Sequence, residues 1–139
     1  MRAAVIDTNV VASGLITGNP DAPPARIVDA MCAGTIVFVV SSALLSEYRD
    51  VLNRPKLRKR HGLTRDEIET LLVTVAENAV VLQPTASVAA PEPGDQHLWD
   101  LLASHESLCL VTGDALLLHA AAPPAPVISA ADFLKLEAD

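Results

Sequence analysis

The chain has 139 residues, half of them hydrophobic, which fits one domain with a single core, residues 1–139, and excludes a disordered protein. No stretch approaches the roughly 18 uninterrupted apolar residues that a membrane helix needs, and the strand-like N-terminus is not that of a signal peptide, so we expect a cytoplasmic protein without membrane contact. The net charge of −7 argues, as a sum, against nucleic acid as a partner, because phosphate prefers a basic surface.

Apolar strand-like runs alternate with helical patterns, which predicts an α/β fold with a parallel sheet and helices on both of its faces. The first part of the chain is expected to form a strand at 3–6, a helix after Asp7, a loop at 18–24, a helix from about Pro24 to Gly34 and a strand at 35–40. The middle part is expected to form a helix from Ser41 or Ser42 to about Asn53, a helix opened by the capping-box pair Thr64 and Glu67, a strand at 79–82 and a loop at 84–94. The last part is expected to form a helix at about 95–106, a strand at 108–111, a short helical piece, a strand at 127–128 and a last helix capped by Ser129.

Four acidic residues are expected at one edge of this sheet. Asp7 follows the first strand directly, and Asp114 follows the fourth after a Thr-Gly turn. Asp95 opens a helix, and Glu47 borders the apolar stripe of another. Ligand sites in parallel α/β sheets lie outside the carboxyl ends of the strands, where the following helices also begin. We therefore expect the four carboxylates to converge.

Carboxylates gathered in one cleft repel one another and raise their own pKa values unless cations neutralise them. Oxygen ligands suit Mg²⁺ or Mn²⁺, and such an ion can activate a water and stabilise charge on a phosphoryl oxygen. Each acid taken alone also has an ordinary explanation, because Asp7, Asp95 and Asp114 could cap helices and Glu47 could be a charge at the border of an amphipathic helix. The coincidence of four acids at one edge favours a metal site.

Other chemistry-bearing residues show no motif. The chain lacks a Cys/His metal cluster, a phosphate-binding glycine loop and a nucleophile elbow. Cys32 and Cys109 lie in apolar runs and are read as small buried residues. His97 comes two residues after Asp95, which points it away from that carboxylate on a regular helix, so we expect it at the surface or in an interface. Trp99 is expected to pack its helix or contact a partner.

Basic residues are concentrated in one segment. Seven of the ten Lys and Arg residues lie between Arg49 and Arg65. The segment is either the solvated face of a helix or a surface placed against phosphate. The candidates for RNA contact are Arg54, Lys56, Arg58, Lys59 and Arg60.

Four segments carry a likeness to a known family. V-I-D-T-N-V-V at 5–11, S-E-Y-R-D-V-L at 46–52, D-Q-H-L-W-D-L-L at 95–102 and L-V-T-G-D at 110–114 follow one another in the order seen in PIN-domain nucleases. The chain resembles in particular the PIN-family toxin components of toxin–antitoxin pairs, over nearly its whole length.

The resemblance implies a three-layer PIN-like sandwich with a parallel sheet of about five strands, Mg²⁺ or Mn²⁺ dependence, hydrolysis of RNA, a small antitoxin partner and a homodimer. The catalytic and metal-binding acids that it implies are Asp7, Glu47, Asp95 and Asp114. The residues in supporting positions are Asn9, Thr112 and Asp100. Related chains often carry Asp-Pro-Asp-Asp where residues 92–95 read Glu-Pro-Gly-Asp, which would weaken a second metal site.

Two other functions fit parts of the pattern. A phosphohydrolase of the haloacid-dehalogenase kind also places an Asp after its first strand, but it needs a second Asp where this chain has Asn9. Such an enzyme also needs a downstream Lys, and this chain has none in a suitable place. A catalytically silent PIN-like scaffold that only binds a partner protein would share the fold without the activity.

Overall fold

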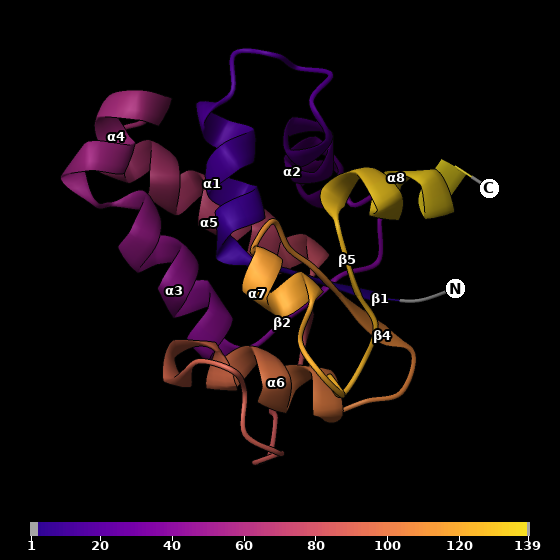
Figure 1. The fold of residues 1–139 in the computed structure, drawn as a ribbon. Helices are drawn as coiled ribbons and strands as arrows, with labels where there is room; N and C mark the ends of the chain where they lie inside the picture. Colours follow the sequence, from indigo (N-terminus) through magenta and orange to yellow (C-terminus); the bar gives the residue numbers. More distant parts are fainter. Residues whose placement is uncertain (1–2, 139) are drawn as a thin grey trace.

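Among the described residues, five short strands form the centre of the fold (Figure 1). The computed structural model describes residues 3–138, so the first two residues and the last of the expected domain lie outside the described residues. The strands are β1 (Ala3–Ile6), β2 (Val39–Val40), β3 (Val80–Val81), β4 (Leu108–Val111) and β5 (Val127–Ile128). β1, β4 and β5 form one parallel sheet and β2 and β3 another. A parallel bridge between Ala4 and Phe38 connects the two, which gives the order β3-β2-β1-β4-β5.

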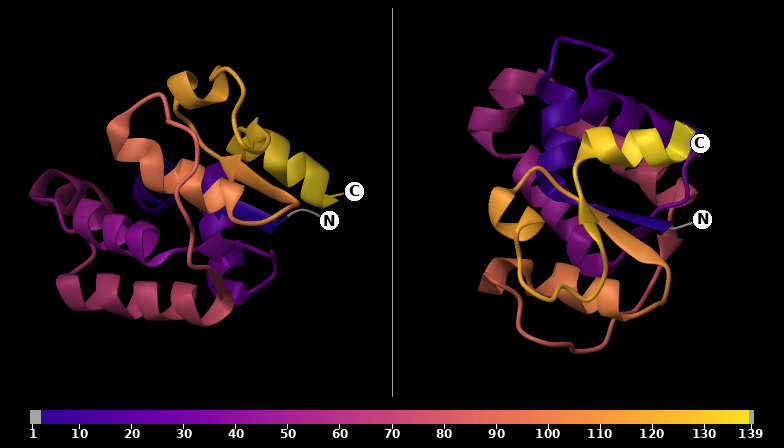
Figure 2. Two further views of the ribbon diagram at one scale, coloured as in Figure 1. Left: turned by 90° about the horizontal axis from the view of Figure 1, so that it is seen from below. Right: turned by 45° about the vertical axis from the view of Figure 1, so that its right-hand side comes forward.

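Helices cover both faces of these strands (Figure 2). They are α1 (Thr8–Ile16), α2 (Pro23–Ala33), α3 (Ser42–Leu52), α4 (Pro55–His61), α5 (Arg65–Asn78), the 3₁₀ turn η1 (Pro93–Asp95), α6 (Gln96–Ala103), α7 (Ala115–Leu118) and α8 (Ala130–Ala138). α6 packs against β1 and β4 on one side, whereas α2 and α5 pack against each other on the opposite side. The predicted α/β sandwich, with parallel strands at its centre, is confirmed.

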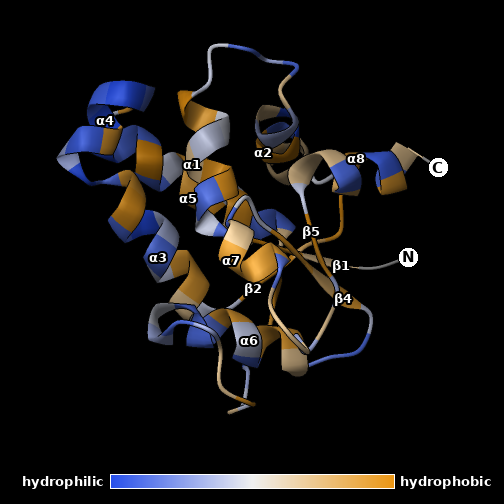
Figure 3. Cartoon of the chain, in the orientation of Figure 1, coloured by the Kyte–Doolittle hydropathy of each residue, from blue (hydrophilic) through white to orange (hydrophobic). Residues whose placement is uncertain are grey.

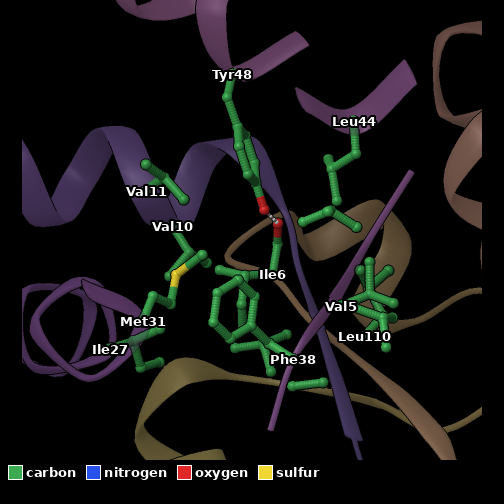
Figure 4. Close-up of a cluster of buried hydrophobic side chains, with 14 of the residues drawn as sticks. Val5, Ile6, Val10, Val11, Ile27, Met31, Phe38, Leu44, Tyr48 and Leu110 are labelled. Carbon is green, nitrogen blue, oxygen red and sulfur yellow. Dashed lines mark hydrogen bonds between the residues drawn. The ribbon is translucent and has the colours of Figure 1, made fainter. Parts of the chain in front are cut away.

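The core is aliphatic, as the composition predicts, and the few aromatic side chains are all inside it. Phe38, Tyr48, Trp99 and Phe133 are each at most 2% exposed. The apolar strands and inward helix faces stand out in Figure 3, and part of the core is drawn in Figure 4. Trp99 therefore packs its helix. Cys109 is buried as expected, but Cys32 is only partly buried and packs against the edge of the core.

Local capping signals explain why several helices begin where they do. The Thr64 hydroxyl accepts from Glu67 N at 3.1 Å, and the Glu67 carboxylate accepts from Thr64 N at 3.0 Å, so the predicted capping box is present. Of the two candidate serines, Ser41 is the cap of α3 and accepts from Leu44 N. Ser129 caps α8 through Asp132 N.

The second strand is much shorter than predicted. Residues 35–40 are apolar enough for a strand, but only Val39–Val40 form one. Gly34 ends α2 with a φ of 70°, and Thr35 N donates to Ala30 O. Thr35 therefore takes part in the C-terminal end of α2 and is not available to the strand. α3 ends at Leu52, close to the predicted Asn53, and Pro55 begins α4, because proline suits the first turn of a helix. Within residues 3–138, no helix is long and apolar enough to cross a membrane.

Candidate active site

Asp7 lies where β1 passes into α1 and is held by three hydrogen bonds. Its Oδ1 accepts from Thr8 N at 2.8 Å, and its Oδ2 accepts from Thr112 Oγ1 at 2.7 Å and from Asn9 Nδ2 at 3.1 Å. The side chain is buried, and burial raises the pKa of the carboxyl against the opposing effect of the Thr112 and Thr8 hydrogen bonds. The charges of Asp95 and Glu47 raise this pKa further, so the structure brings these acids within electrostatic reach of one another.

Two of the three residues expected in supporting positions, Thr112 and Asn9, connect the ends of β1 and β4. Thr112 Oγ1 accepts from Asp114 N at 3.0 Å while it donates to Asp7. Asn9 Oδ1 accepts from Gly113 N at 3.1 Å, and its amide donates toward both Asp7 and Thr112. The turn that carries Asp114 is thereby fixed beside Asp7. Asp114 Oδ1 in turn accepts from Leu116 N at 2.9 Å and caps α7.

Asp95 differs from the other two aspartates that begin helices. It stands between η1 and α6 with φ −98° and ψ 3°, and its side chain makes no capping hydrogen bond. Partial burial raises the pKa of Asp95, the charges of Asp114 and Glu47 add to the rise, and His97 opposes it. The ordinary explanation of Asp95 as a side-chain cap therefore fails, and its carboxylate is not tied to the helix start.

Glu47 projects from α3 and is held on both carboxylate oxygens. Thr8 Oγ1 donates to Oε1 in a short hydrogen bond, and His97 Nε2 lies 2.9 Å from Oε2. The sequence predicts that His97 points away from Asp95 and lies at the surface; its side chain is 20% exposed, but its ring contacts Glu47. The prediction used regular helix geometry from Asp95 onward, whereas Asp95 is the last residue of η1 and α6 starts one residue later. His97 lies one helical turn before the buried Leu101, so the sequence already indicated that His97 borders the inward face of α6.

Two further residues at the site were not predicted. Thr8 is 5% exposed at the first turn of α1, and its place between Asp7 and Asn9 was the available signal. Tyr48 is buried, and its hydroxyl donates to the carbonyl of Ile6 at 2.5 Å (Figure 4). Burial, and then the charges of Asp7 and Glu47, place the pKa of Tyr48 well above its usual value. α3 therefore presents Glu47 and also fixes the end of β1 just before Asp7.

Asp100 has a different set of partners from the four acids. Its Oδ1 accepts from Ser87 N and from Gln96 Nε2, each at 3.0 Å. The hydrogen bond from Gln96 is the main cause that lowers the pKa of Asp100. Gln96 Oε1 also accepts from Ala90 N at 3.0 Å. Asp100 and Gln96 thus attach the loop between β3 and η1 to the helix that Asp95 begins.

The five candidate RNA contacts lie on α4 or, in the case of Arg54, directly before it. α4 packs against α1 and α3 and is the hydrophilic helix at the upper left of Figure 3. Arg54, Lys56, Lys59 and Arg60 are exposed. Arg58 is only partly exposed, and its Nε is buried without a hydrogen-bond partner among residues 3–138. Four of the five candidate RNA contacts are therefore open to solvent.

The donor set at the acidic edge fits a hard divalent cation, because it consists of carboxylate oxygens whose charges already act on one another. In the described part of the chain, however, no three acidic, histidine or cysteine side chains stand close enough together to hold a metal ion. Both oxygens of Asp7 and of Glu47 are occupied by protein hydrogen bonds. The chemistry of the ligands fits, and their side-chain conformations here are not those of a closed metal site.

A family model described as a PIN domain matches residues 3–116. The match includes all four candidate acids, both residues that connect β1 to β4, and the basic segment. No curated protein matches the chain.

Proposed function

Since the chain belongs to the PIN domain family, whose members are generally nucleases, we propose that it is a ribonuclease that hydrolyses RNA phosphodiester bonds with Mg²⁺ or Mn²⁺. One observation carries the proposal: carboxylates from four different elements lie at one edge of the sheet, with Asp7 linked to Glu47 through Thr8 and to the Asp114 turn through Thr112. Burial first, and then the charges of the neighbouring acids, raise the pKa values of Asp7 and Asp95. Such mutual repulsion is relieved by a bound cation.

The residues that would hold the cation are Asp7, Asp95, Asp114 and Glu47. A divalent ion at this place supplies an activated water and positive charge for the phosphoryl oxygens. The remaining residues position the ligands. Thr112 and Asn9 fix one oxygen of Asp7, and Thr8 fixes one oxygen of Glu47.

The haloacid-dehalogenase alternative has less support. Asn9 stands where that chemistry needs a second Asp, and its amide donates to Asp7 Oδ2. An amide cannot act as the general acid and base of such a reaction. A generic phosphatase substrate, assayed beside RNA, separates the two functions.

We further propose that the protein is the toxin of a toxin–antitoxin pair, acts in the cytoplasm, forms a homodimer and is blocked by a small antitoxin. The support is the likeness of its four acidic motifs to those of PIN-family toxins. Production of the protein with and without the product of a neighbouring small gene tests this role, because the proposal expects growth arrest only without it.

The central experiment is the substitution Asp7→Asn. We expect Mn²⁺-dependent cleavage of RNA to fall by at least ~10²-fold, because a metal ligand is lost. The fold should persist, since asparagine caps helices about as well as aspartate. Asp29→Asn, an exposed acid on α2, is the matched control and should cleave like the wild type. Full activity in EDTA, or in Asp7→Asn, would refute the proposal.

A further inference from the structure

The contact between His97 and Glu47 connects two elements of the candidate site. His97 is the second residue of α6, and its Nε2 lies 2.9 Å from Glu47 Oε2 on α3. The other oxygen of Glu47 accepts from Thr8 on α1. The Glu47 carboxylate is therefore fixed from two sides, by groups on two different helices.

The second ring nitrogen of His97 indicates which proton the ring carries. Nδ1 is buried and has no hydrogen-bond partner among residues 3–138. A proton on Nδ1 would be a buried donor without an acceptor, which is costly, whereas a proton on Nε2 is donated to Glu47. A proton on Nε2 satisfies this geometry, and with it His97 donates to Glu47 and orients the carboxylate.

Packing does not require this contact. The side chains of His97 and Glu47 are 20% and 31% exposed, respectively. α6 is anchored instead by Leu98 and Trp99, which are at most 2% exposed. The hydrogen bond lies at the open edge of the sheet, where it fixes a carboxylate and adds little to the core.

We propose that His97 is a positioning residue that keeps the Glu47 carboxylate at the acidic edge, where each of its oxygens accepts one protein hydrogen bond and retains a lone pair for the divalent cation. The inference rests on the proposed function. His97 acts through Glu47 and does not touch RNA. Hydrogen-bond partners of metal ligands typically contribute 10–100-fold to metal affinity, and His97 should have an effect of this size.

The test measures Mn²⁺ binding directly, by calorimetry without RNA. His97→Leu keeps the approximate volume and removes the donor, so we expect the Kd for Mn²⁺ to rise about 10-fold or more. His97→Gln places an amide N–H near the position of Nε2 and should recover most of the affinity. His97→Asn, which is polar but one methylene shorter, should not. His105→Leu, an exposed histidine beyond the other end of α6, is the control.

Two comparisons decide the outcome. In a Glu47→Gln background, His97→Leu should cause little additional loss of Mn²⁺ affinity, because the two residues act as one unit. An equal additional loss there, or His97→Leu and His97→Asn proteins that bind Mn²⁺ as tightly as the wild type, would overturn the role of His97 alone. A wild-type protein that binds no Mn²⁺ would overturn the proposed function together with it.

Discussion

Three of the four candidate acids stand at the start of a helix, but only two of them are tied to it. Asp7 and Asp114 accept backbone N–H groups of α1 and α7, whereas the side chain of Asp95 makes no such bond. The raised pKa of Asp95 follows from partial burial and from the charges of Asp114 and Glu47. Without a bound cation, the ionised Asp95 carboxylate therefore destabilises the folded protein, and no capping hydrogen bond offsets this effect.

This difference predicts how a substitution of Asp95 changes stability with pH. Because its pKa is raised above the usual 3.8, the folded protein binds more protons than the unfolded chain just above that value. The ionisation of Asp95 therefore lowers the free energy of unfolding as pH rises from the usual pKa to the raised one. This loss of stability is fully present at neutral pH. In EDTA, Asp95→Asn should be more stable than the wild type at about pH 7, and the gain should disappear as pH falls towards about 4. Urea denaturation across this range measures it.

Asp100→Asn is the matched control, with the opposite sign. Hydrogen bonds from Gln96 and Ser87 lower the pKa of Asp100, so its charge stabilises the folded protein above the usual pKa, and this contribution is lost as pH falls through the lowered value. Asp100→Asn should therefore be less stable than the wild type at neutral pH. An Asp95→Asn protein that is less stable than the wild type in EDTA at neutral pH would contradict the repulsion argument.

The basic residues of α4 could serve to offset the helix dipole or to contact RNA phosphate. Arg58, Lys59 and Arg60 lie in its last turn, where positive charge offsets the helix dipole. That explanation does not cover Lys56, which lies in the first turn and is exposed. α4 also packs against α1 and α3, the helices that carry Thr8 and Glu47. Phosphate contact explains the position of Lys56, which the helix dipole does not.

We expect the exposed bases of α4 to contribute to RNA affinity through phosphate. Replacing Lys56, Lys59 and Arg60 with Gln should weaken binding of all RNA sequences and reduce the slope of log affinity against log salt by about 2, at about 0.7 for each lost contact to a single strand. Filter binding in EDTA at several salt concentrations measures the slope. Arg26→Gln with Lys135→Gln, on α2 and α8, is the control. An unchanged slope in the triple variant would show that α4 is only a solvated helix.

Elements defined by local sequence were predictable, and those defined by distant contacts were not. β1, β4 and the capping box of α5 follow from short patterns, and the structure contains them. The strand expected at 35–40 shrinks to Val39–Val40, because pairing depends on the neighbouring strands and residues 34 and 35 end α2. The convergence of the acids could be inferred, since the strand ends share one edge.

The finer contacts of the site lay beyond the sequence. His97 and Glu47 are 50 residues apart, and their contact depends on a 3₁₀ turn that shifts the start of α6. The hydrogen bond from Tyr48 to Ile6 spans 42 residues and resembles ordinary core packing in the sequence. Both contacts depend on how α3 lies across the end of β1, which no local pattern specifies.

An antitoxin segment could dock on the loop between α1 and α2, and the distance from this loop to the acidic edge limits how such a partner could block the site. The loop follows the outer end of α1, whereas Asp7 precedes the inner end (Figure 1). α1 has 9 residues, so the two are separated by about 13 Å along the helix. An antitoxin segment seated on the loop must therefore extend along α1 before it reaches the carboxylates.

We expect an inhibitory partner to place an Arg or Lys side chain among the acids, because a positive charge there relieves the same repulsion as a cation. The partner and Mn²⁺ should then compete, so inhibition of cleavage in the purified complex should weaken as Mn²⁺ rises. Asp95→Asn should also lower the affinity for the partner measured in EDTA, whereas Asp29→Asn should leave it unchanged. Co-expression with the product of a neighbouring small gene, followed by these assays, tests the idea. A complex that forms but cleaves RNA as fast as the free protein would refute occlusion of the site, even with the nuclease activity established.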